Sequence, residues 1–134
     1  ELVNRGWGLV TREITNFKDL NVWQRGMTLA KLTYQQTKGF PSDERFGLIS
    51  QMQRAAVSIP SNIAEGFNRH STKEYKQFLS VALGSAGELE TQYLLADALG
   101  YLDQSNLSEI VEELDAVSRM LRALIAKLEV RIAS

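Results

Sequence analysis

Apolar residues recur in steps of three and four along four long stretches of the chain, which is the spacing of helices with one buried face. The pattern predicts helices over residues 18–38, 42–65, 71–99 and 105–132. Their expected inner faces carry Leu20, Trp23, Met27, Ala30 and Tyr34 in the first helix; Leu48, Met52, Ala55, Ala56, Ile59 and Ile63 in the second; Tyr75, Phe78, Ala82, Ala86, Leu89, Tyr93 and Ala96 in the third; and Leu107, Ile110, Leu114, Val117, Leu121, Leu124 and Leu128 in the fourth. Four such helices with short connections favour an all-α fold, an antiparallel up-down four-helix bundle.

The ends of these helices carry recognisable signals. We expect Ser42 to cap the second helix, because serine oxygens accept hydrogen bonds from free helix amides. Ser71 and Glu74 have the spacing of a capping box before the third helix. Residues 1–17 show no clear period, and we expect a flexible N-terminal extension there. Residues 18–134 then form the bundle, so the 134-residue chain is one structural domain.

Two helices contain residues that helix propensity does not explain. Pro60 lies inside the second helix and removes the amide that would bond the carbonyl of Ala56, so we expect a kink. Gly84 and Gly87 lie in the middle of the third helix, where each costs about 1 kcal/mol relative to alanine. Small residues at these positions would let another helix approach closely.

The first and third helices also carry apolar residues away from their expected inner faces. Val22 and Leu29 lie on a second side of the first helix, and Val81, Leu95 and Leu99 on a second side of the third. A symmetric homo-oligomer would bury such residues, and we expect one. The alternative is that they are scattered surface residues, which are common in monomers.

Charge is distributed unevenly although the net charge is only −1. Residues 18–76 carry nine Lys or Arg against five Asp or Glu, whereas residues 77–115 carry eight acids and no base. One interpretation is solvated helix faces. The other is a protein with a basic end and an acidic end, which can orient an anionic partner. The balance lacks the strongly basic footprint of a dedicated nucleic-acid binder.

Catalytic and metal-binding motifs are scarce. The chain has no Cys and one histidine, His70, which excludes disulfides, thiolate sites and clustered histidine ligands. There is no P-loop and no dinucleotide-binding glycine motif, so we expect no cofactor, no metal and no enzymatic activity. A hydrolase that depends on His70 or a carboxylate remains as an alternative. No apolar run approaches a membrane span and no secretory signal is evident, so we expect a soluble, cytoplasmic protein.

A cluster of bases marks the start of the third helix. Arg69, His70, Lys73 and Lys76 surround its N-terminus, where free amides and the helix dipole favour phosphate. These residues form a candidate nucleic-acid-binding site, which Lys18 and Arg25, on one side of the first helix, could extend in an oligomer. The alternative is a solvated basic turn.

Polar residues also share one face of the second helix: Arg54, Ser58, Asn62 and Glu65. On a structural interpretation, Arg54 pairs with a carboxylate such as Glu88, and Asn62 and Ser58 satisfy backbone groups near Pro60. On a functional interpretation, Arg54 faces an anionic ligand. The structural interpretation is favoured.

Several segments resemble a known family. Residues 17–24 read Phe-Lys-Asp-Leu-Asn-Val-Trp-Gln, and residues 54–66 read Arg-Ala-Ala-Val-Ser-Ile-Pro-Ser-Asn-Ile-Ala-Glu-Gly. Together with Phe40-Pro41, residues 71–79, Gly84-Ser85 and residues 88–91, they resemble the bacterial four-helix-bundle proteins encoded in ribosomal RNA intervening sequences. The chain is also similar to the accessory proteins of diversity-generating retroelements.

The resemblance implies a four-helix bundle that assembles as a ring-like homopentamer, with RNA or a ribonucleoprotein as partner, and it implies no catalytic residues. We therefore expect a non-enzymatic oligomeric bundle that binds RNA or a ribonucleoprotein weakly. The alternative is a protein-interaction scaffold that binds no nucleic acid.

Overall fold

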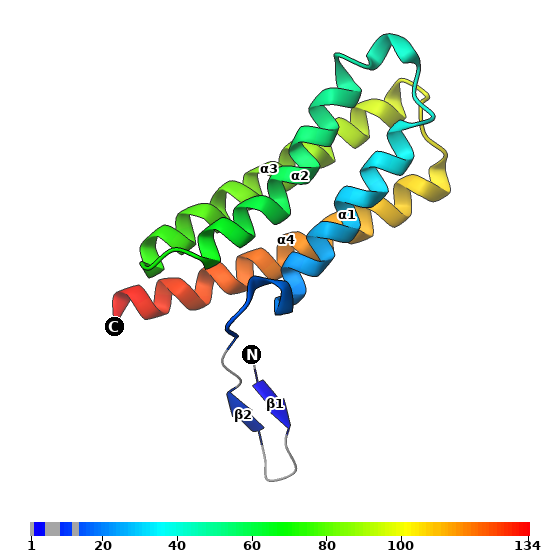
Figure 1. Ribbon diagram of the computed structural model, residues 1–134. Helices are drawn as coiled ribbons and strands as arrows, with labels where there is room; N and C mark the ends of the chain where they lie inside the picture. The colour runs from blue at the N-terminus through cyan, green and yellow to red at the C-terminus, as the bar shows by residue number, and fades with distance from the viewer. Residues whose placement is uncertain (1, 5–8, 12–13) are drawn as a thin grey trace.

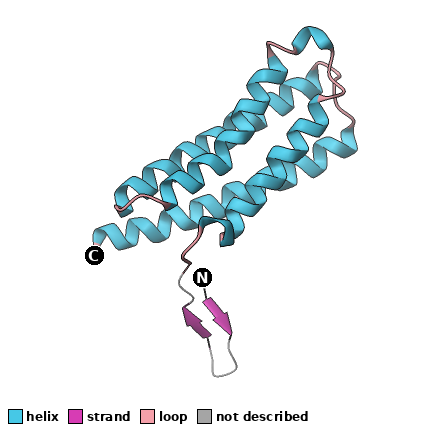
Figure 2. Cartoon of the chain, viewed as in Figure 1, coloured by secondary structure: helices cyan, strands magenta, loops and turns pink. Residues whose placement is uncertain are grey.

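Four long helices make up most of the protein (Figures 1 and 2). The computed structural model describes residues 2–4, 9–11 and 14–134. Its helices are α1 (Asn21–Thr37), α2 (Leu48–Phe67), α3 (Thr72–Ala98) and α4 (Gln104–Ala133), and two short strands, β1 (Leu2–Asn4) and β2 (Leu9–Thr11), precede them. The predicted helical class with four long helices is confirmed.

Each helix packs against two others. Helix α1 packs on α2 and α4, and α3 packs on the same two helices. Figure 1 shows the helices side by side, with the α1–α2 and α3–α4 connections at one end and the α2–α3 connection at the other. Helices α1 and α3 therefore occupy diagonal corners and, within the described residues, share no packed interface.

The core runs along the centre of the four helices. Its largest fully buried side chains come from all of them: Leu29 from α1; Met52, Ile59 and Ile63 from α2; Leu79, Leu89 and Tyr93 from α3; and Ile110, Leu114, Val117 and Leu121 from α4. Full burial of one such aliphatic side chain is worth roughly 1.5–3 kcal/mol before entropy is subtracted. Except for Phe78, the residues predicted for the inner faces of α2, α3 and α4 belong to this core or pack against it. Leu79 of α3 and Ile125 of α4 are core residues that were not predicted.

The inner face predicted for α1 is wrong in part. Met27 and Tyr34 are exposed, while Val22, Leu29 and Thr33 are buried instead. The true inner face was hard to recognise because two of its members are threonines and another is a glycine. A Cβ added to that glycine, Gly26, would lie 3.4 Å from Cγ2 of Ile59 and 3.5 Å from the Pro60 ring, so α1 approaches α2 closely there.

A hydrogen bond joins the diagonal helices across the core. The hydroxyl of Tyr93 donates to Thr33 Oγ1 at 2.7 Å, and Thr33 Oγ1 donates to the carbonyl of Leu29 at 2.9 Å. Both buried hydroxyls are thus satisfied, as buried polar groups require. Burial raises the pKa of Tyr93 to about 12, and the bond to Thr33 opposes this rise.

Helix α1 starts later than predicted. Residues Phe17–Asp19 form a short 3-10 helix, whose first amides are capped by Asn16 Oδ1 at 2.9 Å from the Lys18 amide. The α-helix then begins at Asn21. The capping serves the 3-10 turn, so Lys18 lies in a separate element before α1.

Helix α2 also starts later than predicted, because Ser42 does not cap it. Residues Ser42–Glu44 form a 3-10 turn, and the helix begins at Leu48. The amide of Leu48 donates to Glu44 Oε1 at 3.3 Å, and the hydroxyl of Tyr101 donates to the other carboxylate oxygen at 3.0 Å. Glu44 therefore occupies the positive end of α2 and ties it to the α3–α4 connection.

The remaining helix signals have mixed outcomes. The amide of Glu74 donates to Ser71 Oγ at 3.2 Å, as the capping-box prediction requires. Helix α2 continues through Pro60, which is buried. A Cβ added at Gly84 or Gly87 would lie more than 4 Å from every described residue outside α3, so no other described helix approaches these glycines closely.

The N-terminal region contains a small hairpin. Strand β1 pairs antiparallel with β2, with Val3 opposite Val10. The predicted flexible extension over residues 1–17 falls partly on residues 1, 5–8 and 12–13, which lie outside the described residues. The β-branched residues on both sides of a glycine-containing segment are the signal for these strands that the helical pattern did not reveal.

Candidate functional site

The connection between α2 and α3 is built around a cluster of aromatic rings. Phe67 and Tyr75 meet edge to face, with ring centroids 6.0 Å apart. A Cβ added at Gly66 would lie 2.7 Å from Cβ of Phe78 and 3.2 Å from the carbonyl oxygen of Tyr75. Only glycine fits this approach without a shift, so the connection holds the start of α3 firmly against the end of α2.

Arg69 is held within this connection. Its guanidinium lies 4.8 Å from the centroid of the Phe78 ring and donates to Glu65 Oε1 at 2.8 Å. Both partners reduce its availability to a ligand, because the positive charge is already matched by a carboxylate. His70 is exposed and forms no hydrogen bond or ion pair with the described residues.

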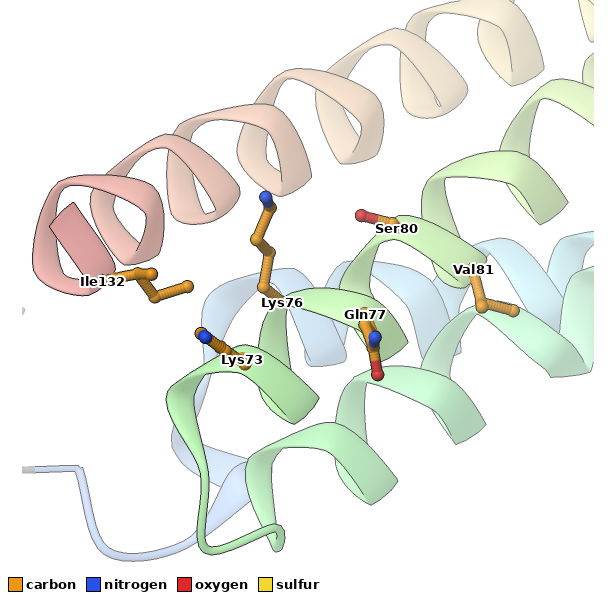
Figure 3. A pocket seen from close by; sticks show the side chains of 6 residues that line it. All are labelled: Lys73, Lys76, Gln77, Ser80, Val81 and Ile132. Atoms are coloured by element: carbon orange, nitrogen blue, oxygen red, sulfur yellow. The ribbon is translucent and has the colours of Figure 1, made fainter.

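Lys73 and Lys76 border an open groove between α3 and the end of α4 (Figure 3). The groove has a volume of about 530 Å³, and its other lining residues are Gln77, Ser80, Val81 and Ile132. Figure 3 shows both lysine side chains and Ile132 reaching into the space between the two helices. The groove therefore combines an apolar floor with two cationic groups one helical turn apart.

The two lysines differ in their surroundings. Lys76 Nζ lies 3.8 Å from Glu129 Oε1, a long ion pair between exposed groups and worth little. Lys73 has no ion-pair partner within the described residues. Below them, burial raises the pKa of Tyr75 to about 12 despite the opposing charge of Arg131, so this phenol stays neutral near pH 7.

Lys18 and Arg25 do not adjoin this groove within one chain. Arg25 donates to both carboxylate oxygens of Glu113 on α4, at 3.0 and 3.3 Å. This hydrogen bond and the charge of Glu113 hold the pKa of Arg25 above its usual value. Glu113 precedes Ile132 by 19 residues of one helix, which corresponds to about 28 Å. Lys18 lies in the 3-10 turn before α1.

The six predicted nucleic-acid-binding residues therefore divide into two groups. Arg25, Arg69 and Lys76 each face a carboxylate of their own chain, from Glu113, Glu65 and Glu129 respectively. Lys73, His70 and Lys18 are exposed without such a partner in the described parts of the chain. Lys73 is thus the strongest candidate to meet an external anion, with Lys76 beside it.

The polar residues of α2 form a seam with α3 that is structural in character. Arg54 donates to Glu88 and, at 2.9 Å, to Gln51 Oε1. Glu88 also accepts from Gln92 Nε2 at 3.2 Å. The pairing of Arg54 with Glu88, one candidate named from the sequence, is present. With its charge matched, Arg54 has no need of an external anion.

Further along the seam, Ser58 Oγ lies 2.9 Å from Ser85 Oγ, and Asn62 Nδ2 donates to the Ser58 carbonyl at 2.7 Å and to its hydroxyl at 2.9 Å. Asn62 thus satisfies backbone close to Pro60, as the structural interpretation expects. Ser58 instead bridges to α3. Glu65 leaves this seam and pairs with Arg69.

Within residues 2–4, 9–11 and 14–134, no group of three or more His, Asp or Glu side chains could hold a metal ion. In the same residues, no helix combines the length and apolarity needed to cross a membrane. The groove and the seam can bind and position groups through charge, hydrogen bonds and apolar contact.

The sequence revealed the basic residues but did not reveal the carboxylates that pair with Arg25 and Lys76. Glu113 and Glu129 are distant in sequence from the bases they face, and Ile132 is the α4 contribution to the groove. Their positions depend on how α4 is shifted along α1 and α3, which a single sequence does not reveal. The pairing of Glu65 with Arg69 could have been predicted, because residues four positions apart are neighbours on a helix.

Comparisons with known proteins agree on a family. Residues 18–123 match the family model described as 23S rRNA-intervening sequence protein. A solved structure, a protein of unknown function from the S23 ribosomal protein family of Bacteroides thetaiotaomicron, superposes with a TM-score of 0.72 at 21% sequence identity. That match covers 78% of this chain and 95% of the other, and it shows the fold alone. No curated protein matches the chain.

Proposed function

Because the chain belongs to the 23S rRNA-intervening sequence protein family, we propose that it is a non-enzymatic, cytoplasmic helical-bundle protein that binds structured RNA or a ribonucleoprotein weakly. In this proposal the four helices form an antiparallel up-down bundle, and copies assemble as a ring-like homo-oligomer, a pentamer by the family resemblance. The likeness to accessory proteins of diversity-generating retroelements belongs to the same proposal.

The observation that carries the RNA proposal is the groove at the start of α3. Lys73 and Lys76 border it next to the helix amides, and Lys73 has no carboxylate partner in the described chain. Phosphate groups are attracted to such an arrangement of fixed amides and mobile ammonium groups. Because three of the five lysines and arginines predicted to bind RNA are already paired within the chain, binding through one subunit should be weak. A ring would repeat the groove and strengthen binding through multivalency.

Retention of a structured RNA at low salt tests the proposal. Replacing Arg69, Lys73 and Lys76 together by Glu should abolish retention, and Lys73→Glu alone should cause the largest loss among the single variants. With two or three phosphate contacts per site, wild-type affinity should fall about ten- to thirtyfold between about 50 and 200 mM salt.

Arg45→Glu is the control for Lys73→Glu, because it makes the same change in charge on an exposed residue of the α1–α2 connection, at the other end of the helices from the groove. It should leave retention nearly unchanged. Equal binding by wild type and the triple variant would show that the groove is not the RNA site. No binding by wild type at about 50 mM salt would refute RNA recognition itself.

A second candidate function is a protein-interaction scaffold without nucleic-acid binding. The observation in its favour is the set of cations that are already matched by carboxylates of the same chain. It predicts a protein partner that remains bound to the purified ring after nuclease treatment and that binds the triple variant as tightly as wild type.

A further inference from the structure

Two helices at diagonal corners expose apolar side chains that the chain itself leaves uncovered. The α3 strip consists of Val81, Leu94, Leu95 and Leu99, which are 53%, 50%, 49% and 49% exposed, together with Gly84 and Gly87. The α1 strip consists of Met27 and Tyr34, which are 39% and 46% exposed, together with Lys31 and Lys38. Scattered apolar residues need no explanation, but residues aligned along one helix side form a continuous surface.

The α3 strip has the form of a helix-packing surface. At about 100° per residue, Val81, Gly84, Leu95 and Leu99 lie within an arc of about 60° around α3, and Gly87 and Leu94 lie about 60–80° further round the helix. Apart from the neighbouring backbone of α3 itself, no described atom lies within 4 Å of a Cβ added at either glycine. Both glycines lower the helix propensity of α3 and do not help to pack the core. Their small size would instead allow another molecule to pack closely against α3.

The α1 strip lies on the side of α1 that faces away from the core. Thr33 faces the core, where it accepts the hydrogen bond from Tyr93, and Gly26 faces α2. These contacts fix the rotation of α1 about its axis and turn Met27 and Tyr34 outward. Because α1 and α3 are diagonal neighbours, the two strips point to opposite sides of the subunit.

The two strips also differ in charge. Helix α1 contains no acid over Asn21–Thr37; its Arg25 is paired with Glu113, but Lys31 has no ion-pair partner within the described residues. Helix α3 from Gln77 onward contains no base; its Glu88 is paired with Arg54, but Glu90 and Asp97 form no ion pair within the described residues. A contact between α1 of one copy and α3 of another is therefore electrostatically favourable, whereas a contact between two α3 strips brings like charges together.

We propose that the α1 strip of one copy packs on the α3 strip of the next copy, with Met27 and Tyr34 seated over Gly84 and Gly87. This inference rests on the self-assembly in the proposed function and assigns the surfaces that perform it. The contact is heterologous, so every subunit uses a different face toward each of its two neighbours. Repetition of one such contact generates a ring when the rotation between copies closes.

Light scattering on two variants and on their mixture tests the assignment. The α1 variant carries Met27→Glu and Tyr34→Glu, and the α3 variant carries Val81→Glu and Leu95→Glu. Each should show only the 15.0 kDa mass of one subunit. Each variant retains the strip that the other lacks, so mixing them should restore one intact contact and give a complex of two subunits.

Phe46→Glu is the control, because Phe46 is 89% exposed and belongs to neither strip. It should keep the wild-type mass, and circular dichroism should show native helix content in all variants. A wild type that stays a single subunit at high concentration would refute self-assembly and this inference together. An assembled wild type whose mass neither double variant changes would refute the strip assignment alone. An α1 variant that forms dimers without the α3 variant would indicate α3–α3 pairing and would also overturn it.

Discussion

The inner and outer faces of α3 are both apolar, yet they have opposite exposure. On the inner face, Ala82, Leu89 and Tyr93 are fully buried. On the outer face, Val81 and Leu95 are each about half exposed. The inner residues are explained by the fold of one subunit, whereas the described part of one subunit leaves the outer residues uncovered, and the proposed contact between copies would cover them.

The glycines beside these two faces sharpen the contrast. Gly66 lies where a Cβ would collide with Phe78 at 2.7 Å, so its smallness is required by the subunit itself. Gly87 lies where a Cβ would meet nothing within 4 Å. The same residue type thus reports a close contact at one place and an unoccupied surface at the other, and substitutions should separate the two roles.

The largest effect should come from shortening an inner leucine. Leu89→Ala should lower the free energy of unfolding by about 2–5 kcal/mol, because it leaves a cavity in the core. The matched outer substitution, Leu95→Ala, should change the stability of the isolated subunit by no more than about 0.5 kcal/mol. Urea unfolding, with the α1 variant (Met27→Glu and Tyr34→Glu) as the single-subunit background for both, measures the difference. Equal losses would mean that the outer face is part of the core.

Gly66→Ala should be the next most damaging change. The added methyl group must displace Phe78 or the backbone of Tyr75, at a cost of about 1–3 kcal/mol typical of overpacking. Thermal unfolding should show a lower midpoint with unchanged helix content. A neutral Gly66→Ala would show that the α2–α3 connection can open to admit a side chain.

Alkaline pH should weaken the inner face through Tyr93. Its pKa is about 12 in the folded protein and about 10 when unfolded, so the unfolded state loses its proton first. The associated stability is complete below pH 10 and is lost as the pH rises toward 12. Tyr93→Phe should cost about 1 kcal/mol at pH 7 through the lost bond to Thr33, but should lose less stability than wild type between pH 10 and 12. Urea unfolding of wild type and Tyr93→Phe at pH 7 and above pH 10 measures this difference. Equal losses of stability in the two proteins as the pH rises would contradict the prediction.

The smallest effect should come from the outer glycine and should have the opposite sign. Gly87→Ala should stabilise an isolated subunit by up to about 1 kcal/mol, because alanine is the better helix former and nothing obstructs its methyl group. The same change should weaken assembly, which light scattering would detect as a lower mass at equal concentration. An assembly that tolerates Gly87→Ala would place the neighbouring copy elsewhere.

The sequence was sufficient for most of the fold because three helices bury conventional aliphatic stripes. In α4, Ile110, Leu114 and Val117 repeat at helical spacing, and all are buried as predicted. Helix α1 was misread because its inner face contains Gly26 and Thr33, whose packing depends on Pro60 and Tyr93 of other helices. Periodicity of apolar residues cannot detect a face that is held by a close backbone approach and a hydrogen bond.

The candidate site was predictable to a similar degree. The bases at the start of α3 could be anticipated, since neighbouring positions on one helix are set by the helical repeat. For Arg54, the sequence offered Glu88 only as one candidate among the carboxylates of other helices, and the structure selects it. The neutralisation of Arg25 by Glu113 could not, because it depends on the longitudinal placement of α4 against α1. Local geometry follows from spacing, whereas cross-helix partners follow only from the assembled bundle.

The hydrogen bond from Tyr93 to Thr33 selects between two possible rotations of α1 about its own axis. Two sides of α1 carry enough apolar residues to face the core, so hydrophobicity alone does not determine which side is buried. Turning the other side inward would leave the Tyr93 hydroxyl without its partner in a dry interior, at a cost of about 1–3 kcal/mol. The Tyr93–Thr33 hydrogen bond thus determines which side of α1 faces the core.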